Sequence, residues 1–146
     1  TDFGALVNAP NIEGFVEAAG LVHIYGGSVQ IDGTVKSTTA TGRVLLSGRT
    51  SVSINGTVSS AEESGVPGNV IDIHAGVSQL WDVATLRGAV TRSQLNGGVV
   101  FVTNGSFINA TNTVNVISGG DVVIDAITAA GDAVTVDTPV IVTYEN

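Results

Sequence analysis

Two heptapeptides decide the fold of this chain: Val29-Gln30-Ile31-Asp32-Gly33-Thr34-Val35 and Val52-Ser53-Ile54-Asn55-Gly56-Thr57-Val58. They differ only at their second and fourth positions. In both, Val and Ile alternate with polar residues, which is the period of a β-strand that buries one of its faces. The Asp-Gly or Asn-Gly step in the middle favours a sharp turn, so each heptapeptide joins two short strands.

The repeat extends upstream of both heptapeptides. Val44 and Leu46 repeat Val22 and Ile24 at a constant interval, and one inserted residue separates this match from the heptapeptides. The chain therefore contains an internal repeat of about 22 residues, each with two or three short strands. Looser copies continue the alternation of apolar and polar residues to the end of the chain.

A repeat of this size predicts an all-β fold, a parallel β-helix or solenoid, in which each coil adds one strand to each of several parallel sheets. The same alternation also suits an antiparallel β-sandwich or jelly roll. Long loops predicted at residues 59–68 and 86–97 interrupt the coil spacing and keep this alternative open. In either case we expect one domain over residues 1–146, with the repeat body at residues 21–146.

The segment ahead of the repeat body, residues 1–20, is predicted to form an arm or cap. Ile12, Phe15, Val16 and Ala19 fall at helical spacing, and Asn11 is a suitable N-cap, so the pattern predicts a short helix. An irregular arm is the alternative.

The composition excludes several classes of function. Charged residues make up 12% of the chain, against about 25% in typical globular proteins. The net charge of −8 repels phosphate backbones, so we expect no nucleic-acid partner. There is no run of about 18 apolar residues, so we expect no membrane insertion. Cysteine is absent, which removes disulfides and thiolate metal ligands.

Two nine-residue segments that begin with the heptapeptides, residues 29–37 and 52–60, resemble coils of the filamentous-haemagglutinin-type repeats of two-partner-secreted bacterial adhesins. The resemblance is best over these segments and looser over the later copies. It implies a right-handed parallel β-helix, and it implies adhesion as a function.

Few residues carry recognisable chemistry. His23 and His74 lie in the polar phase of their strands, so we expect both at the surface. Asp121, Asp125 and Asp132 stand in a Gly-containing region without positive charge, and oxygen ligands on turns are what a calcium site uses. Solvated acids on turns are the alternative. No Gly-x-Ser-x-Gly elbow or helical His pair occurs, so we expect no catalytic residue and no other cofactor.

The leading functional hypothesis is a non-enzymatic structural module that assembles or adheres on a cell surface, an extracellular fibre or a particle exterior. Its expected partners are further copies of itself and a surface glycan or host surface. The alternatives are a β-sandwich subunit of a fibre, virus capsid or tail that uses strand addition, and a polysaccharide-acting β-helix enzyme. A chain that begins at Thr1 fits removal of an initiator Met, which leaves it in the cytoplasm or in a virion, or removal of a signal peptide, which exports it. We expect an extracellular or cell-surface location, with a virion as the alternative.

The two terminal segments are predicted to join copies of the chain. Residues 3–7 and 139–144 are uncharged and rich in apolar residues, and neither contains the Lys that commonly protects a sheet edge. Head-to-tail pairing of such edges gives a ring or a fibre. The alternative is that each terminus folds back and caps its own subunit.

Overall fold

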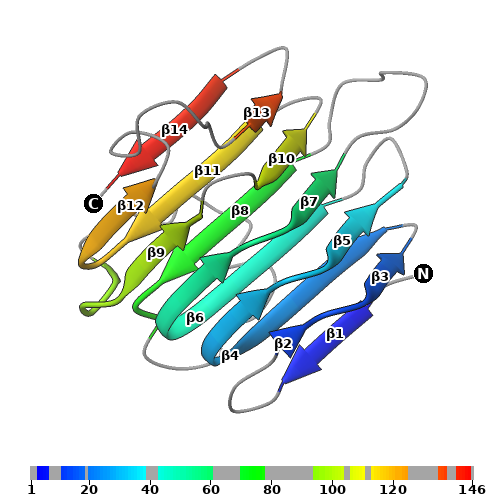
Figure 1. Cartoon of the computed structure of the whole chain (residues 1–146). Coiled ribbons are helices and arrows are strands. Elements are labelled where there is room, and N and C mark those ends of the chain that lie inside the picture. The colour runs from blue at the N-terminus through cyan, green and yellow to red at the C-terminus, as the bar shows by residue number, and fades with distance from the viewer. Residues whose placement is uncertain are drawn as a thin grey trace.

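The computed structural model describes residues 3–6, 11–18, 20–38, 43–60, 70–77, 94–103, 106–110, 113–124, 135–137 and 141–145. In this part of the chain the regular elements are β-strands, and they form two sheets (Figure 1). The prediction of an all-β fold is therefore confirmed.

The larger sheet has nine strands. Six of them lie side by side in the order β1-β4-β6-β8-β11-β14. Of the other three, β2 pairs with β4, β9 pairs with β6, and β12 pairs with β9. Its strands are β1 (Phe3–Leu6), β2 (Asn11–Ile12), β4 (Leu21–Ile31), β6 (Arg43–Ile54), β8 (Val70–Ala75), β9 (Val99–Val102), β11 (Thr113–Ser118), β12 (Asp121–Ile124) and β14 (Ile141–Glu145). The five-stranded sheet has the order β13-β10-β7-β5-β3. Its strands are β3 (Phe15–Ala18), β5 (Thr34–Ser37), β7 (Thr57–Ser60), β10 (Phe107–Ala110) and β13 (Thr135–Asp137).

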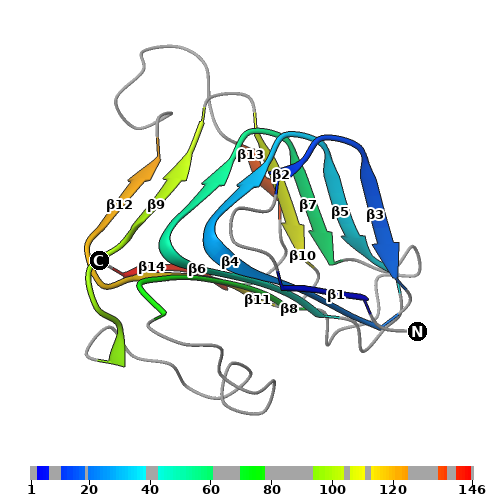
Figure 2. The ribbon, with the colours of Figure 1, turned by 90° about the horizontal axis from the view of Figure 1, so that it is seen from below.

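The long strands β4 and β6 bend, and this bend shapes the larger sheet. Their first halves pair in the register that sets Val22 beside Val44. Their second halves set Val29 beside Val52, which lengthens the interval between partners by the one inserted residue. The register shifts between Gly26 and Ser28. Seen from below, the bent nine-stranded sheet and the five-stranded sheet together enclose the core on nearly all sides (Figure 2).

Every pairing between described strands is parallel. The antiparallel sandwich alternative is therefore wrong. Alternation alone leaves strand direction open, but successive copies of the repeat lie side by side and run in the same direction. Parallel strands need a long connection between them, and the intervening strands of each repeat provide it.

The core consists of rows of Val, Ile and Leu that cross the sheets from strand to strand. One row joins Val22, Val44, Ile71 and Val114, which are all fully buried. β-branched side chains pack well in such rows because their restricted χ1 angle fits a pleated surface. Complete burial of each of these side chains contributes about 1.5–3 kcal/mol to stability.

Glycines at the turn between the sheets allow successive repeats to approach closely. A Cβ at Gly33 would overlap the carbonyl oxygen of Gly14, and a Cβ at Gly56 would overlap the carbonyl oxygen of Gly33. The backbone amides that follow these glycines hydrogen-bond to the turn before. Thr34 N donates to Gly14 O at 2.8 Å, and Thr57 N donates to Gly33 O at 2.9 Å. The Gly of each heptapeptide is thus required by the stacking of the turns.

The short helix predicted near the N-terminus is wrong. Residues 11–12 and 15–18 form β2 and β3 instead, and these strands pair with β4 and β5. The apolar residues that fit one face of a helix also fit two short strands, because Gly14 separates them at the same turn as Gly33. Pairing with the heptapeptide strands therefore overrides a weak helical pattern.

Candidate functional site: two sheet edges and a buried polar cluster

The N-terminal strands lie at one end of both sheets. Among the described strands, β1 and β2 pair only with β4, and β3 pairs only with β5. Their other sides carry backbone N–H and C=O groups that no described strand meets. Figure 1 shows β1, β2 and β3 together at this end, which we call the N-edge.

The opposite end is formed by β12, β13 and β14, which we call the C-edge (Figure 1). Within the described part of the chain, β14 pairs only with β11, β13 only with β10, and β12 only with β9. The segments predicted to join copies of the chain thus contribute β1 to the N-edge and β14 to the C-edge. Residues 7, 139 and 140 of those segments lie outside the described residues.

The core rows run from one edge to the other. The row of Val22 begins at Phe3 of β1 and ends at Val142 of β14. In the five-stranded sheet, the row of Val35 begins at Val16 of β3 and ends at Val136 of β13. At both edges, the positions that continue a core row therefore hold apolar residues. This is the composition expected of an edge on which a further strand adds to the sheet.

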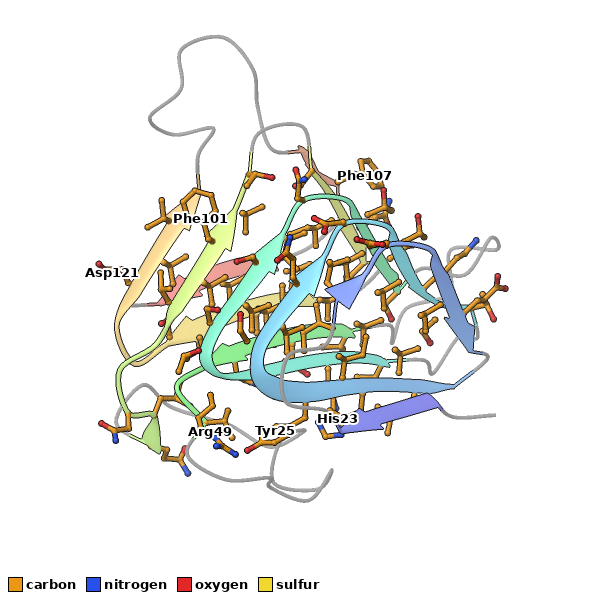
Figure 3. The ribbon with its side chains drawn as sticks, turned by 60° about the horizontal axis from the view of Figure 1, so that its bottom comes forward. His23, Tyr25, Arg49, Phe101, Phe107 and Asp121 are labelled. Atoms are coloured by element: carbon orange, nitrogen blue, oxygen red, sulfur yellow. The ribbon has the colours of Figure 1, made fainter. Side chains whose placement is uncertain are left out.

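The predicted calcium ligands are not brought together in the described residues. Asp121 is exposed at the start of β12, and Figure 3 shows it on the outer side of that strand. Asp125 and Asp132 lie outside the described residues. In the part of the chain that the structure describes, no group of three or more His, Cys, Asp or Glu side chains is arranged to hold a metal ion. The calcium site stays a prediction.

The expectation of two surface histidines is wrong for His74, whose exposed fraction is 1%. His23 is half-buried. Both lie on the face of the nine-stranded sheet that points away from the core, and Figure 3 shows His23 and Tyr25 on this side of β4. The alternation correctly places them away from the core, but it carries no information on whether that face is covered.

Six polar side chains on this outer face form what we call the outer polar cluster. They are His23 and Tyr25 of β4, Arg43 and Ser47 of β6, and Asp72 and His74 of β8. Parallel register places Tyr25 beside Ser47 and Ser47 beside His74. Arg43 and Asp72 form an ion pair with 3.0 Å between Nε and Oδ2, and Asn115 donates a 2.8 Å hydrogen bond to Asp72 Oδ1.

Burial of the outer polar cluster controls the protonation of its histidines. Desolvation lowers the pKa of His74 to about 4, and the positive charges of Arg43 and of protonated His23 contribute to this lowering. Desolvation also lowers the pKa of His23. Both imidazoles are therefore neutral at pH 7.

Ser47, His74 and Asp72 share this face, but they are not arranged as a catalytic triad. Among the described residues, neither Ser47 Oγ nor His74 Nδ1 has a hydrogen-bond partner, so the serine is not hydrogen-bonded to a general base. All three side chains are buried. Sequence reasoning missed the cluster because only the parallel register brings together residues as far apart as Tyr25 and His74.

The described residues include no helix long and apolar enough to cross a membrane. Comparisons of the chain with protein-family models, with curated proteins and with solved structures found no match.

Proposed function

We propose that this chain is a non-enzymatic structural module with the architecture of a parallel β-helix, and that it assembles with copies of itself. The β-helix is supported by the pairing of the neighbouring strands β4 and β6. The number of residues along the sequence between paired residues changes by only one over the whole length of these two strands. Further support comes from the turns, which hydrogen-bond to one another in series from Gly14 through Gly33 and Gly56 to Phe107. In this architecture each coil contributes a strand to each face, and the coils stack along one axis.

Self-assembly is the function that best fits the two edges. The observation that carries it is that the N-edge and the C-edge each leave strands of both sheets paired on one side only, within the described residues. Unprotected strand edges with apolar residues are templates for pairing with another chain. An edge that must stay monomeric is usually protected by charged side chains, above all Lys, by Pro or by a bulge. The described residues of β1, β3, β13 and β14 contain no Lys or Pro, and β3, β13 and β14 each carry one acidic residue.

We place the assembled module on a cell surface, an extracellular fibre or the exterior of a particle such as a virion. A stack of parallel coils is rigid along its axis, and the outward face of its five-stranded sheet is the surface that we propose contacts a surface glycan or a host surface. The outward positions of β5 and β7 carry small polar side chains and one Lys, which suits a face in contact with water: Thr34, Lys36, Thr57 and Ser59.

Sedimentation velocity over a concentration series tests the proposal. The wild-type chain is expected to sediment as larger species as its concentration rises. Val16→Lys places a charge on the core row at the N-edge and is expected to lower self-association at least about tenfold, because a buried charge at an edge opposes pairing. Thr57→Lys is the matched control, since it adds the same side chain to an outward position of an internal strand.

The control variant is expected to associate as the wild type does, and circular dichroism establishes that both variants are folded. A wild-type chain that stays monomeric at the highest concentration reached contradicts the proposal. Equal association of the Val16→Lys and Thr57→Lys variants contradicts the assignment of the edges as the contact.

A further inference from the structure

Asn55 and Gly56 form the turn between β6 and β7, and this turn brings together the groups that an asparagine needs to modify itself. We propose that Asn55 is a site of spontaneous deamidation, at which the folded chain converts its own side-chain amide to a carboxylate. Asn55 is exposed, so water reaches its side chain. The turn is also part of the hydrogen-bonded series of turns, which makes its chemistry relevant to the stack.

The reaction requires only water as a second reactant. The backbone nitrogen of Gly56 attacks Cγ of Asn55 and forms a new C–N bond. The C–N bond of the side-chain amide breaks, and its nitrogen leaves as ammonia with the proton that the Gly56 nitrogen loses. Water then opens the resulting succinimide ring. Attack of water on Cγ gives aspartate, and attack on the backbone carbonyl carbon gives isoaspartate.

The nucleophile is a backbone amide that the stacking of the turns leaves uncommitted. On one side of it, Asn55 N donates to Ile31 O at 2.7 Å. On the other side, Thr57 N donates to Gly33 O at 2.9 Å. Gly56 N itself forms no hydrogen bond with any described residue. A Cβ at Gly56 would overlap Gly33 O, so the stack keeps at this position the residue that hinders the attack least.

The electrophile is Cγ of Asn55, and a hydroxyl group is in place to activate it. Thr103 Oγ1 donates to Asn55 Oδ1 at 2.6 Å. The same hydroxyl lies 3.1 Å from Ile54 O, but that oxygen already accepts hydrogen bonds from Thr103 N at 2.9 Å and from Ser106 Oγ at 3.0 Å. The hydroxyl proton is therefore directed at Asn55 Oδ1. A donor there stabilises the negative charge that develops on this oxygen during the attack.

Two comparable turns in the described residues lack this combination. Asp32 precedes Gly33 in the turn before, but a carboxylate is a poor electrophile, and both of its oxygens accept from Gln30 Nε2, at 3.1 and 2.9 Å. Asn96 precedes Gly97 and is exposed, but its side chain forms no hydrogen bond with the described residues. Asn55 is therefore expected to convert faster than Asn96.

The two products differ in their effect on the stack. Aspartate at position 55 reproduces the Asp32-Gly33 step of the first heptapeptide, so we expect the turn to accept it. Isoaspartate carries the backbone through the side chain and adds a methylene group between Cα of residue 55 and the nitrogen of Gly56. The amides of residues 55 and 57 both donate to the preceding repeat, and the longer turn cannot keep both in place. Isoaspartate therefore loosens the contact between the turns of Gly33 and Gly56.

Peptide mapping by mass spectrometry follows the reaction in the folded wild-type chain during incubation at mildly alkaline pH. The same chain unfolded in guanidinium chloride is the reference, because its Asn-Gly steps react without help from the structure. Conversion of Asn55 in the folded chain is expected to be at least as fast as in the unfolded chain, and faster than conversion of Asn96. An isoaspartyl methyltransferase labels isoaspartate and so separates the two products, which have equal mass.

A pair of variants tests the role of Thr103. Thr103→Val removes the hydroxyl and is expected to slow the conversion of Asn55 about fivefold, which is the effect of one typical hydrogen bond. Thr103→Ser keeps the hydroxyl and is the matched control, expected to convert as the wild type does. Circular dichroism establishes that both variants are folded.

Conversion of Asn55 in the folded chain at the unfolded rate or above, slowed by Thr103→Val and not by Thr103→Ser, supports the proposal. Slower conversion of Asn55 in the folded chain than in the unfolded chain overturns it. Equal rates in the Thr103→Val and Thr103→Ser variants, or conversion of Asn96 as fast as that of Asn55, overturn the assignment of Thr103 as the activating group.

Discussion

Acidification is predicted to destabilise this fold through His74. The imidazole is 1% exposed and lies in a cluster with the Arg43–Asp72 ion pair, with His23 on the same face. Its pKa is lowered to about 4 in the folded chain, whereas an unfolded chain has the ordinary value of 6.5. The unfolded chain therefore binds a proton first as the pH falls.

The direction and size of the effect follow from these two pKa values. Above pH 6.5 the contribution of neutral His74 to stability is fully present, and it is lost as the pH falls from 6.5 towards 4. By linkage, the loss is about 2 kcal/mol at pH 5 relative to pH 8, and it approaches about 3 kcal/mol below pH 4. For a domain of this size, about 2 kcal/mol is a large part of a total stability of roughly 5–15 kcal/mol.

Urea unfolding of the wild type and of His74→Gln between pH 8 and pH 4.5 measures this loss. The variant removes the titrating group, so its free energy of unfolding is expected to fall by about 2 kcal/mol less than that of the wild type between pH 8 and pH 5. His23→Gln is the matched control, and its pH dependence is expected to stay closer to that of the wild type because His23 is less buried. Identical pH dependence of the wild type and His74→Gln would show that protonation of His74 does not cause the loss of stability.

Three further changes test the packing. Asp72→Asn leaves Arg43 without its ion pair and is expected to lower the free energy of unfolding by about 3 kcal/mol in urea titrations, whereas a loss below about 0.5 kcal/mol would contradict a buried pair. Gly33→Ala drives a Cβ against the carbonyl oxygen of Gly14 and is expected to lower the free energy of unfolding by about 1–3 kcal/mol. Gly14→Ala is the control, because its Cβ meets nothing within 4 Å and the substitution is expected to be tolerated. Thermal unfolding compares the two variants. Ile54→Ala removes a fully buried side chain from a core row and is expected to cost about 3 kcal/mol, and a tolerated substitution would contradict the assignment of the core.

The repeat was the most informative part of the sequence. The predicted correspondence of Val22 with Val44, and of Val29 with Val52, is confirmed as direct strand pairing, and the inserted residue between the two matches is the register shift after Gly26. Residues that repeat at a fixed interval and alternate in polarity leave few ways to bury their apolar face. The parallel sheets follow from that constraint, whereas the β-helix itself stays a proposal.

The errors have physical causes. The segment from Ile12 to Ala18 is too short to show a period, so its pairing with the heptapeptide strands could not be inferred from its own residues. The burial of His74 depends on what covers the outer face of the sheet, and alternation identifies only the face. The pairing of Arg43 with Asp72 joins residues on different repeats, and it requires the register that places β6 beside β8.

Electron cryomicroscopy of the assembled wild-type chain is the decisive test of self-assembly through the edges, because it resolves the contact between copies. We expect strands of the N-edge of one copy to pair with strands of the C-edge of the next, at a strand spacing of about 4.8 Å that continues through the boundary. An assembly in which both edges remain unpaired, or in which the copies meet through their outward faces, would contradict this expectation.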